Sequence, residues 1–146
     1  MLLLSSHRVG SAVGALGSLQ LQWLVQRLQN SERRDRPLVV ALHYSPTAIG
    51  DAGMDAIRLL DQACLEELLR PHRVLRAVLF GHTYQHRQGS CSTWPDVLLL
   101  GCPSTLCSFK AVQPCPLGRP DDPGGRLLDL TPDGGIQHRI LRWSSF

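Results

Sequence analysis

Two short apolar runs in the chain each end in a histidine. Residues 74–80 (VLRAVLF) lead into Gly81 and His82, and residues 37–42 (PLVVAL) lead into His43. Continuous apolar runs of this length predict strands buried on both faces, as in parallel sheets, and open α/β sheets carry their chemistry at the carboxyl ends of such strands. Taken singly, either histidine is better explained as a loop residue without function. Their repetition at two strand ends favours a site.

The segment between these strands has the pattern of a helix. Residues 55–69 carry apolar side chains at helical spacing, namely Ile57, Leu60, Cys64 and Leu68. Pro71 ends the pattern, because proline cannot continue a helix. The order strand, helix, strand predicts a parallel crossover, which brings His43 and His82 to the same edge of one sheet.

The rest of the pattern completes an α/β fold. Residues 1–4 predict a short strand, and Ser18 is a candidate N-cap for an amphipathic helix with Leu19, Trp23, Leu24 and Leu28 on one face. Apolar runs at 97–100, 127–130 and 136–141 predict further strands. The last two are joined by residues 131–135 (TPDGG), which favour a hairpin. We therefore expect a mixed sheet with a C-terminal antiparallel hairpin.

Length and charge narrow the class of protein. The 146 residues suffice for one domain, and the net charge of +3 comes almost wholly from scattered arginines, since Lys110 is the only lysine. This pattern predicts no nucleic-acid partner. We interpret the cluster at Arg33, Arg34 and Arg36 as a solvated loop. No segment is long and apolar enough to predict a membrane span, so we expect no membrane partner and a cytoplasmic location.

The cysteines do not predict a disulfide framework. Their number is odd, and no Cys-x-x-Cys pair occurs; they are Cys64, Cys91, Cys102, Cys107 and Cys115. We expect most of them to be small buried apolar residues. The alternative is a metal site formed by the last four, whose irregular spacing disfavours it.

Several short motifs occur in an order typical of one protein family. They are residues 17–24 (GSLQLQWL), VALH at 40–43 followed by Pro46, GHxxQ at 81–85, CPST at 102–105 and GRLLDL at 125–130 before Asp133 and Gly134. In these motifs the chain resembles the C-terminal half of a calcineurin-like metallophosphoesterase, and specifically the bacterial class III 3′,5′-cyclic AMP phosphodiesterases. The resemblance implies a partial αββα sandwich spanning residues 1–146, with the N-terminal metal-binding half missing.

The resemblance also implies a chemistry. Members of this family use two metal ions, such as manganese or iron, to clamp a phosphate and activate the attacking water. By resemblance, His43 and His82 are ligands of one metal, and Ser104 and Thr105 lie near the substrate, which is a cyclic nucleotide. Tyr84 occupies the position of a second histidine that binds the other metal and contacts the phosphate, so it is expected on the substrate side. A neutral phenol is a poor ligand for a divalent ion. His86 is interpreted as a surface histidine.

Most of the family's ligands have no counterpart in this chain. The aspartate-x-histidine, the bridging aspartate and the asparagine-histidine-aspartate loop are not found, and Gly50-Asp51 is interpreted as a turn. A metal centre therefore cannot be completed by this chain alone, and we expect weak or no metal binding and an inactive chain. The partners expected are a separate polypeptide carrying the N-terminal half, or a second copy through self-association. The alternatives are a decayed phosphodiesterase and a small α/β interaction module with structural histidines.

Overall fold

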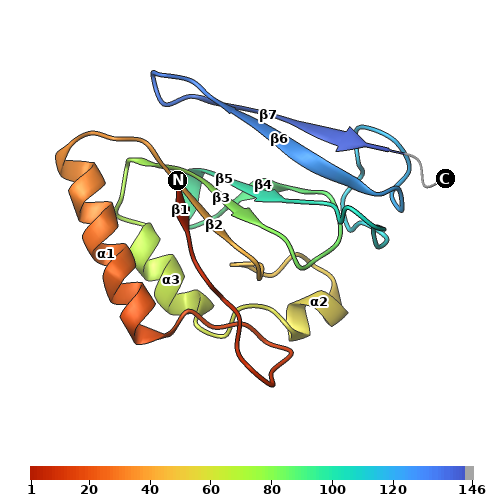
Figure 1. The fold of residues 1–146 in the computed structure, drawn as a ribbon, viewed down its shortest axis with the longest axis horizontal. Helices are drawn as coiled ribbons and strands as arrows, with labels where there is room; N and C mark the ends of the chain where they lie inside the picture. Colours follow the sequence, from red (N-terminus) through yellow and green to blue (C-terminus); the bar gives the residue numbers. More distant parts are fainter. Residues whose placement is uncertain (144–146) are drawn as a thin grey trace.

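The computed structural model describes residues 1–143, which form a mixed sheet and a separate hairpin (Figure 1). The sheet has the strand order β1 (Leu2–Leu3), β2 (Leu38–Leu42), β3 (Leu75–Phe80), β5 (Trp94–Gly101) and β4 (Arg87–Cys91). The first four strands in this order are parallel, and β4 is antiparallel to β5. β6 (Gly124–Leu130) and β7 (Ile136–Arg142) pair only with each other.

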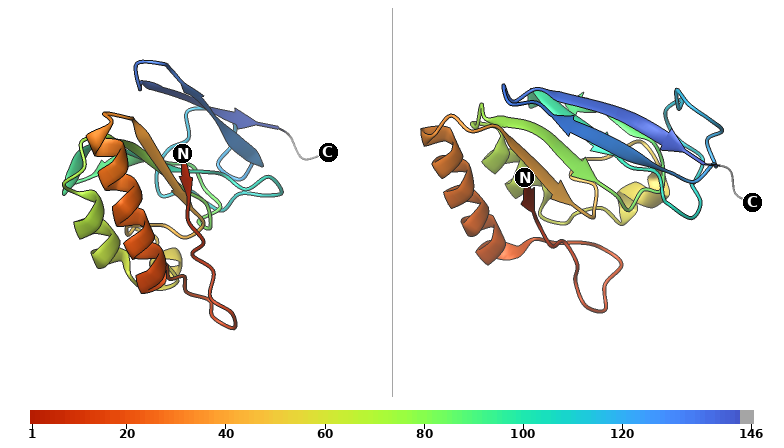
Figure 2. Two further views of the ribbon diagram at one scale, coloured as in Figure 1. Left: turned by 60° about the vertical axis from the view of Figure 1, so that its left-hand side comes forward. Right: turned by 45° about the horizontal axis from the view of Figure 1, so that its top comes forward.

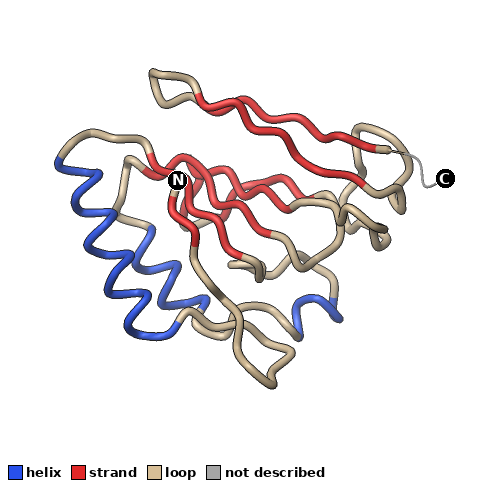
Figure 3. The backbone as a smooth tube through the Cα atoms, viewed as in Figure 1, coloured by secondary structure: helices blue, strands red, loops and turns tan. Residues whose placement is uncertain are grey.

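The elements lie in three layers. Helices α1 (Gly17–Arg33) and α3 (Gln62–Leu69) lie side by side on one face of the sheet, and the β6–β7 hairpin lies over the opposite face (Figure 2). The short helix α2 (Ala52–Ala56) belongs to the long connection after β2, as the tube drawing shows (Figure 3). The expected α/β class and the C-terminal antiparallel hairpin are confirmed.

The central strands are apolar throughout because both of their faces are covered. Alternate residues of β2, β3 and β5 point to the helices, where Val40, Val78 and Leu99 join a core with Leu24 and Leu65. The intervening residues point to the hairpin and form a smaller cluster. From the sheet it contains Val39, Ala77 and Leu100 with partly buried Leu79 and Leu98, and from the hairpin it contains partly buried Leu128 and Ile136. The continuous apolar runs of the sequence thus reflect burial on two sides.

The hairpin turn has the form that its sequence predicts. Gly134 N donates to Thr131 O at 2.9 Å, and Thr131 N donates to Gly135 O at 3.1 Å. Gly134 has a left-handed backbone with φ of +83°, and a Cβ atom there would lie 2.2 Å from Pro37 Cγ. Glycine is therefore required both by the turn and by the approach of the turn to the residue before β2.

The predicted helix at 55–69 is wrong in its middle. The chain forms α2 and α3 with an irregular segment between them, because the backbone there bonds to other parts of the chain. Leu60 N donates to Gly14 O at 2.8 Å, and Leu59 is buried beside Gly14. The buried face of α3 is consequently Leu65 and Leu69, while Leu60 and Cys64 are exposed.

The predicted start of α1 also needs correction. Ser18 lies inside the helix, which begins at Gly17 and has no side-chain cap of its own. The cap is supplied by Asp61, which is far away in the sequence. Its carboxylate accepts hydrogen bonds from Leu16 N at 2.9 Å and from Gly17 N at 2.8 Å. The buried face is narrower than expected, because Leu24 and Leu28 are fully buried but Leu19 is exposed.

Asp61→Ala should lower the free energy of unfolding by about 1–2 kcal/mol, because two amide donors at the start of α1 lose their acceptor. Urea denaturation followed by circular dichroism measures this change. Glu67→Ala, at an exposed position of α3, is the matched control and should change stability by less than about 0.5 kcal/mol. Equal effects of the two substitutions would contradict the capping role of Asp61.

Candidate metal-ligand site

The ends of β2 and β3 bring the two predicted histidines together. Leu42 pairs with Phe80 in the parallel register, and just beyond this pair Gly81 N donates to His43 O at 3.0 Å. His82 follows with φ of +61°, a left-handed conformation that is uncommon outside glycine and that turns the ring back toward β2. His82 Nδ1 lies 3.2 Å from His43 Nε2. We refer to His43 and His82 as the imidazole pair.

Two residues that the sequence did not single out support the imidazole pair. The buried ring of Tyr44 lies against the His82 ring, with 4.1 Å between centroids, and meets the His43 ring edge-on at 5.2 Å. The buried Ser6 hydroxyl accepts from His43 N and Tyr44 N, each at 3.2 Å. Tyr44 could have been suspected because it adjoins His43, but nothing in the sequence connects Ser6 to this place.

The surroundings favour neutral imidazoles. Partial burial lowers the pKa of His43. Burial also lowers the pKa of His82, repulsion from His43 lowers it further, and the backbone of Ile57 acts in the opposite direction. Because each ring has a pKa below its ordinary value, both are neutral at pH 7 and can offer a nitrogen lone pair.

The imidazole pair fits a metal ion, but only as part of a ligand set. Two nitrogens bound to one ion at about 2.1 Å, with an angle near 100° at the ion, lie about 3.2 Å apart, which matches the separation of His82 Nδ1 from His43 Nε2. His82 Nε2 is buried and has no hydrogen-bond partner. Within residues 1–143, however, no three histidine, cysteine, aspartate or glutamate side chains converge on one point.

The same finding bears on the cysteines. The alternative metal site from Cys91, Cys102, Cys107 and Cys115 is wrong for the described part of the chain. All five cysteines are free thiols, and the expectation that most are buried is also wrong, since Cys64 and Cys107 are exposed and the others are half-buried.

The remaining predicted residues lie in two loops. Tyr84 is exposed, has φ of +53°, and its ring lies 5.0 Å from that of Phe109. Ser104 Oγ accepts from Leu106 N at 3.2 Å, and the Thr105 carbonyl accepts from Trp143 Nε1 at 3.3 Å. In the described chain, these hydrogen bonds tie Ser104 and Thr105 to their own loop and to the end of β7, and none joins them to the imidazole pair.

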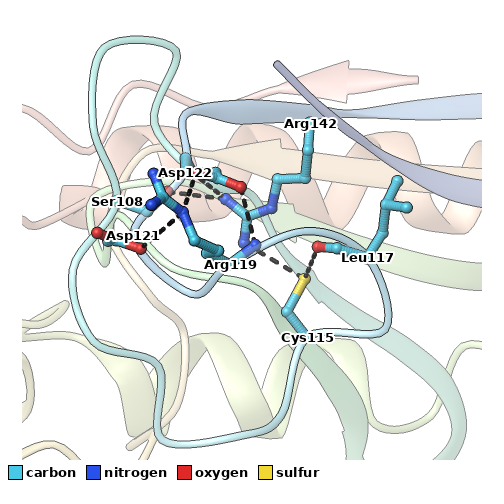
Figure 4. A network of polar contacts seen from close by, with 7 residues as sticks. All are labelled: Ser108, Cys115, Leu117, Arg119, Asp121, Asp122 and Arg142. Atoms are coloured by element: carbon cyan, nitrogen blue, oxygen red, sulfur yellow. Dashed lines mark hydrogen bonds and ion pairs between the residues drawn. The ribbon is translucent and has the colours of Figure 1, made fainter. Parts of the chain in front are cut away.

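The loop of residues 102–123 contains Ser104 and Thr105. The side chain of Arg142, on β7, anchors this loop. The Arg142 guanidinium donates to Ser108 Oγ at 3.1 Å, to the Asp122 carbonyl and to Cys115 Sγ at 3.3 Å (Figure 4). Near the end of the loop, Arg119 N donates to the Asp122 carboxylate at 2.8 Å. Together these bonds fix an otherwise irregular segment beside the hairpin.

His86 is not a surface histidine. Its side chain is 2 % exposed, and its Nδ1 accepts from Arg126 Nη2 at 3.1 Å. The same guanidinium donates to His138 Nδ1 at 3.0 Å and to the carbonyls of Arg87 and Gly101. Burial and the positive charges of Arg126, Arg142 and Arg87, together with the neighbouring His138 imidazole, lower the pKa of His86 to about 4. His86 therefore serves as a neutral acceptor that seats the hairpin on the sheet.

Comparison with known proteins gives the site a family context. The chain is 52% identical over 145 residues to a probable cyclic nucleotide phosphodiesterase of Synechococcus sp. strain WH7803, covering 99% of this chain and 55% of that protein. It is 34% identical over 150 residues to the 3′,5′-cyclic adenosine monophosphate phosphodiesterase CpdA of Pseudomonas aeruginosa, covering 97% and 50%. The chain is a homologue of cyclic nucleotide phosphodiesterases. No family profile matches its sequence.

The fold of this chain is similar to that of a solved structure. A dimetal phosphatase from Danio rerio superimposes with a TM-score of 0.55, at 13% identity, over 90% of this chain and 40% of that protein. The chain spans about half the length of the relatives it matches. No helix within residues 1–143 has the length and apolar character of a transmembrane segment.

Acidification should destabilise the protein through His86. The unfolded chain, with a histidine pKa near 6.5, binds more protons than the folded chain between pH 6.5 and 4, so the free energy of unfolding falls as the pH is lowered through this window. Over this window the free energy of unfolding should fall by up to about 3 kcal/mol. Above pH 6.5 the contribution of His86 is constant.

The measurement is urea denaturation from pH 7.5 to 4 for the wild type and His86→Gln, whose amide oxygen can still accept from Arg126. The variant should show a smaller loss of stability on acidification. His7→Gln, at an exposed histidine, is the control for the substitution. Identical pH profiles for the wild type and His86→Gln would show that His86 is not buried in its neutral form.

Proposed function

We propose that the chain is part of a metal-dependent phosphodiesterase that hydrolyses cyclic nucleotides, with the imidazole pair as ligands of one metal ion. The observation that supports this proposal is the 3.2 Å approach of His82 Nδ1 to His43 Nε2 at the ends of adjacent parallel strands. The names of the relatives suggest a 3′,5′-cyclic nucleotide, with cyclic AMP as the first candidate. The proposed location is the cytoplasm.

The residues of this chain contribute position and charge state. A bound divalent ion, manganese or iron, supplies Lewis-acid stabilisation of the phosphate and a more acidic attacking water. His43 Nε2 and His82 Nδ1 would hold this ion as neutral imidazole ligands. Tyr44 packs against both rings and restricts their rotation, so the pair is oriented before any ligand binds.

Residues 1–146 are proposed to form one partial domain that is inactive alone. Two imidazoles leave most positions around a metal ion to other ligands, and within residues 1–143 no third candidate side chain joins them. We propose that the missing carboxylates belong to the part of the relatives' fold that residues 1–146 do not span. Tyr84, Ser104 and Thr105 would then face the substrate from this side.

A second candidate is a non-enzymatic α/β interaction module with structural histidines. It is favoured by the presence of Tyr84, a poor ligand for divalent ions, at the position where the family's second histidine is expected. In this case the contact between His43 and His82 is a hydrogen bond that closes the ends of β2 and β3. The two candidates differ in whether metal binds at the imidazole pair.

The test combines metal binding with complementation. The purified chain is titrated with Mn²⁺ and Fe²⁺ by calorimetry, alone and after mixing with the segment of the Synechococcus WH7803 relative that this chain does not match. We expect weak binding and no cyclic AMP hydrolysis by the chain alone, and tight binding with hydrolysis by the mixture. His82→Asn should weaken metal binding by more than about tenfold and abolish hydrolysis, because asparagine tolerates the left-handed backbone but removes the imidazole.

His7→Asn, at an exposed histidine, is the matched control and should retain both properties. Hydrolysis that survives His82→Asn would contradict the ligand role. Metal affinity in the mixture that is unaffected by the substitution would favour the interaction module.

A further inference from the structure

Two exposed aromatic side chains contact each other, and one of them, Tyr84, follows His82 by two residues. Tyr84 is 39% exposed and Phe109 is 47% exposed, yet their ring centroids are only 5.0 Å apart and their planes differ by 37°. Exposed aromatic rings that contact each other leave flat apolar faces in water, which favours a binding role over a structural one. We call Tyr84 and Phe109 the aromatic pair.

The aromatic pair is held in place by the backbone on both sides. Phe109 N donates to Tyr84 O at 2.8 Å, and Val112 N donates to the buried Gln85 side chain at 2.9 Å. Thr83 and Gln85 are fully buried, so the chain alternates and Tyr84 points outward between them. Arg142 fixes Ser108, the neighbour of Phe109 (Figure 4). The two rings are therefore ordered before a ligand binds, which reduces the entropic cost of binding.

The spacing of Tyr84 from His82 along the chain is compatible with the length of a nucleotide. Tyr84 follows His82 by two residues, a separation of at most about 7 Å along the backbone, which is comparable to the span of the ribose between phosphate and base. A phosphate at the imidazole pair would thus place its base within reach of Tyr84. Nucleobases have flat faces that stack on aromatic side chains with little dependence on which base is present.

We infer that Tyr84 and Phe109 form a stacking surface for the nucleobase of a nucleotide whose phosphate lies at the imidazole pair. This inference rests on the proposed function and extends it. It assigns a binding role to Phe109, and it gives Tyr84 a function that needs no metal ligation. The neutral phenol that is a poor metal ligand is a good stacking partner.

The test uses ligands that separate the base from the phosphate and needs no metal. In EDTA, the chain is titrated with adenosine, which lacks a phosphate, and with ribose 5-phosphate, which lacks a base. Binding is followed by the NMR signals of the tyrosine and phenylalanine rings. Tyr84→Leu and Phe109→Leu retain apolar bulk but remove a ring, and each should weaken adenosine binding by about five- to tenfold. Tyr84→Phe and Phe109→Tyr should keep wild-type affinity.

Trp23→Leu, at a half-exposed aromatic residue of α1, is the control and should leave adenosine affinity unchanged. Ribose 5-phosphate should not distinguish the variants. Failure of the wild type to bind adenosine, or equal affinity in the leucine variants, would overturn the stacking surface. Failure of metal binding in the preceding experiment would leave the adenosine result intact, so the two proposals can be judged separately.

Discussion

The register between β2 and β3 is the constraint on which the site depends. The strands are parallel and align Leu42 with Phe80, so the chain leaves both strands at the same level. Gly81 N then donates to His43 O and closes the edge, which leaves the rings of His43 and His82 in contact. A slip of one residue would exchange the helix-facing and hairpin-facing side chains of a strand that is buried on both faces. The packing of the core therefore also fixes the geometry of the imidazole pair.

A second constraint is the way in which the hairpin is attached to the sheet. Arg126, on β6, is partly buried and donates only to imidazole nitrogens and backbone carbonyls. No carboxylate within the described chain is bonded to it, so burial lowers the pKa of its guanidinium. The positive charge is tolerated because His86 and His138 remain neutral and orient lone pairs toward it. The attachment of the hairpin thus depends on two histidines that the apolar pattern does not distinguish.

The sequence predicted the parts of the fold that depend on local pattern. The strands around Val40 and Val78 and the hairpin at 131–135 follow from apolar runs and turn residues, and the meeting of His43 and His82 follows from topology. The break between α2 and α3 was not predictable, because it is caused by backbone bonding to the distant Gly14. The edge strand β4 was missed because Gln88, Gly89 and Ser90 lack apolar character. His86 was misjudged because its burial depends on Arg126, forty residues away.

The two faces of the sheet differ in how completely this chain covers them. The helix face has a large continuous core, whereas the hairpin face has a small cluster and an adjoining cavity of about 210 Å³, lined by residues that include Ala41, Leu79, Gly81 and Leu128. This cavity reaches the strand ends that carry the imidazole pair. The β6–β7 hairpin also leaves strand edges unpaired in the described structure, and such edges accept further strands. Elements that paired with these edges would lie over the hairpin face, next to the strand ends that carry the imidazole pair. They would therefore be placed to supply the further ligands that the proposed metal ion requires.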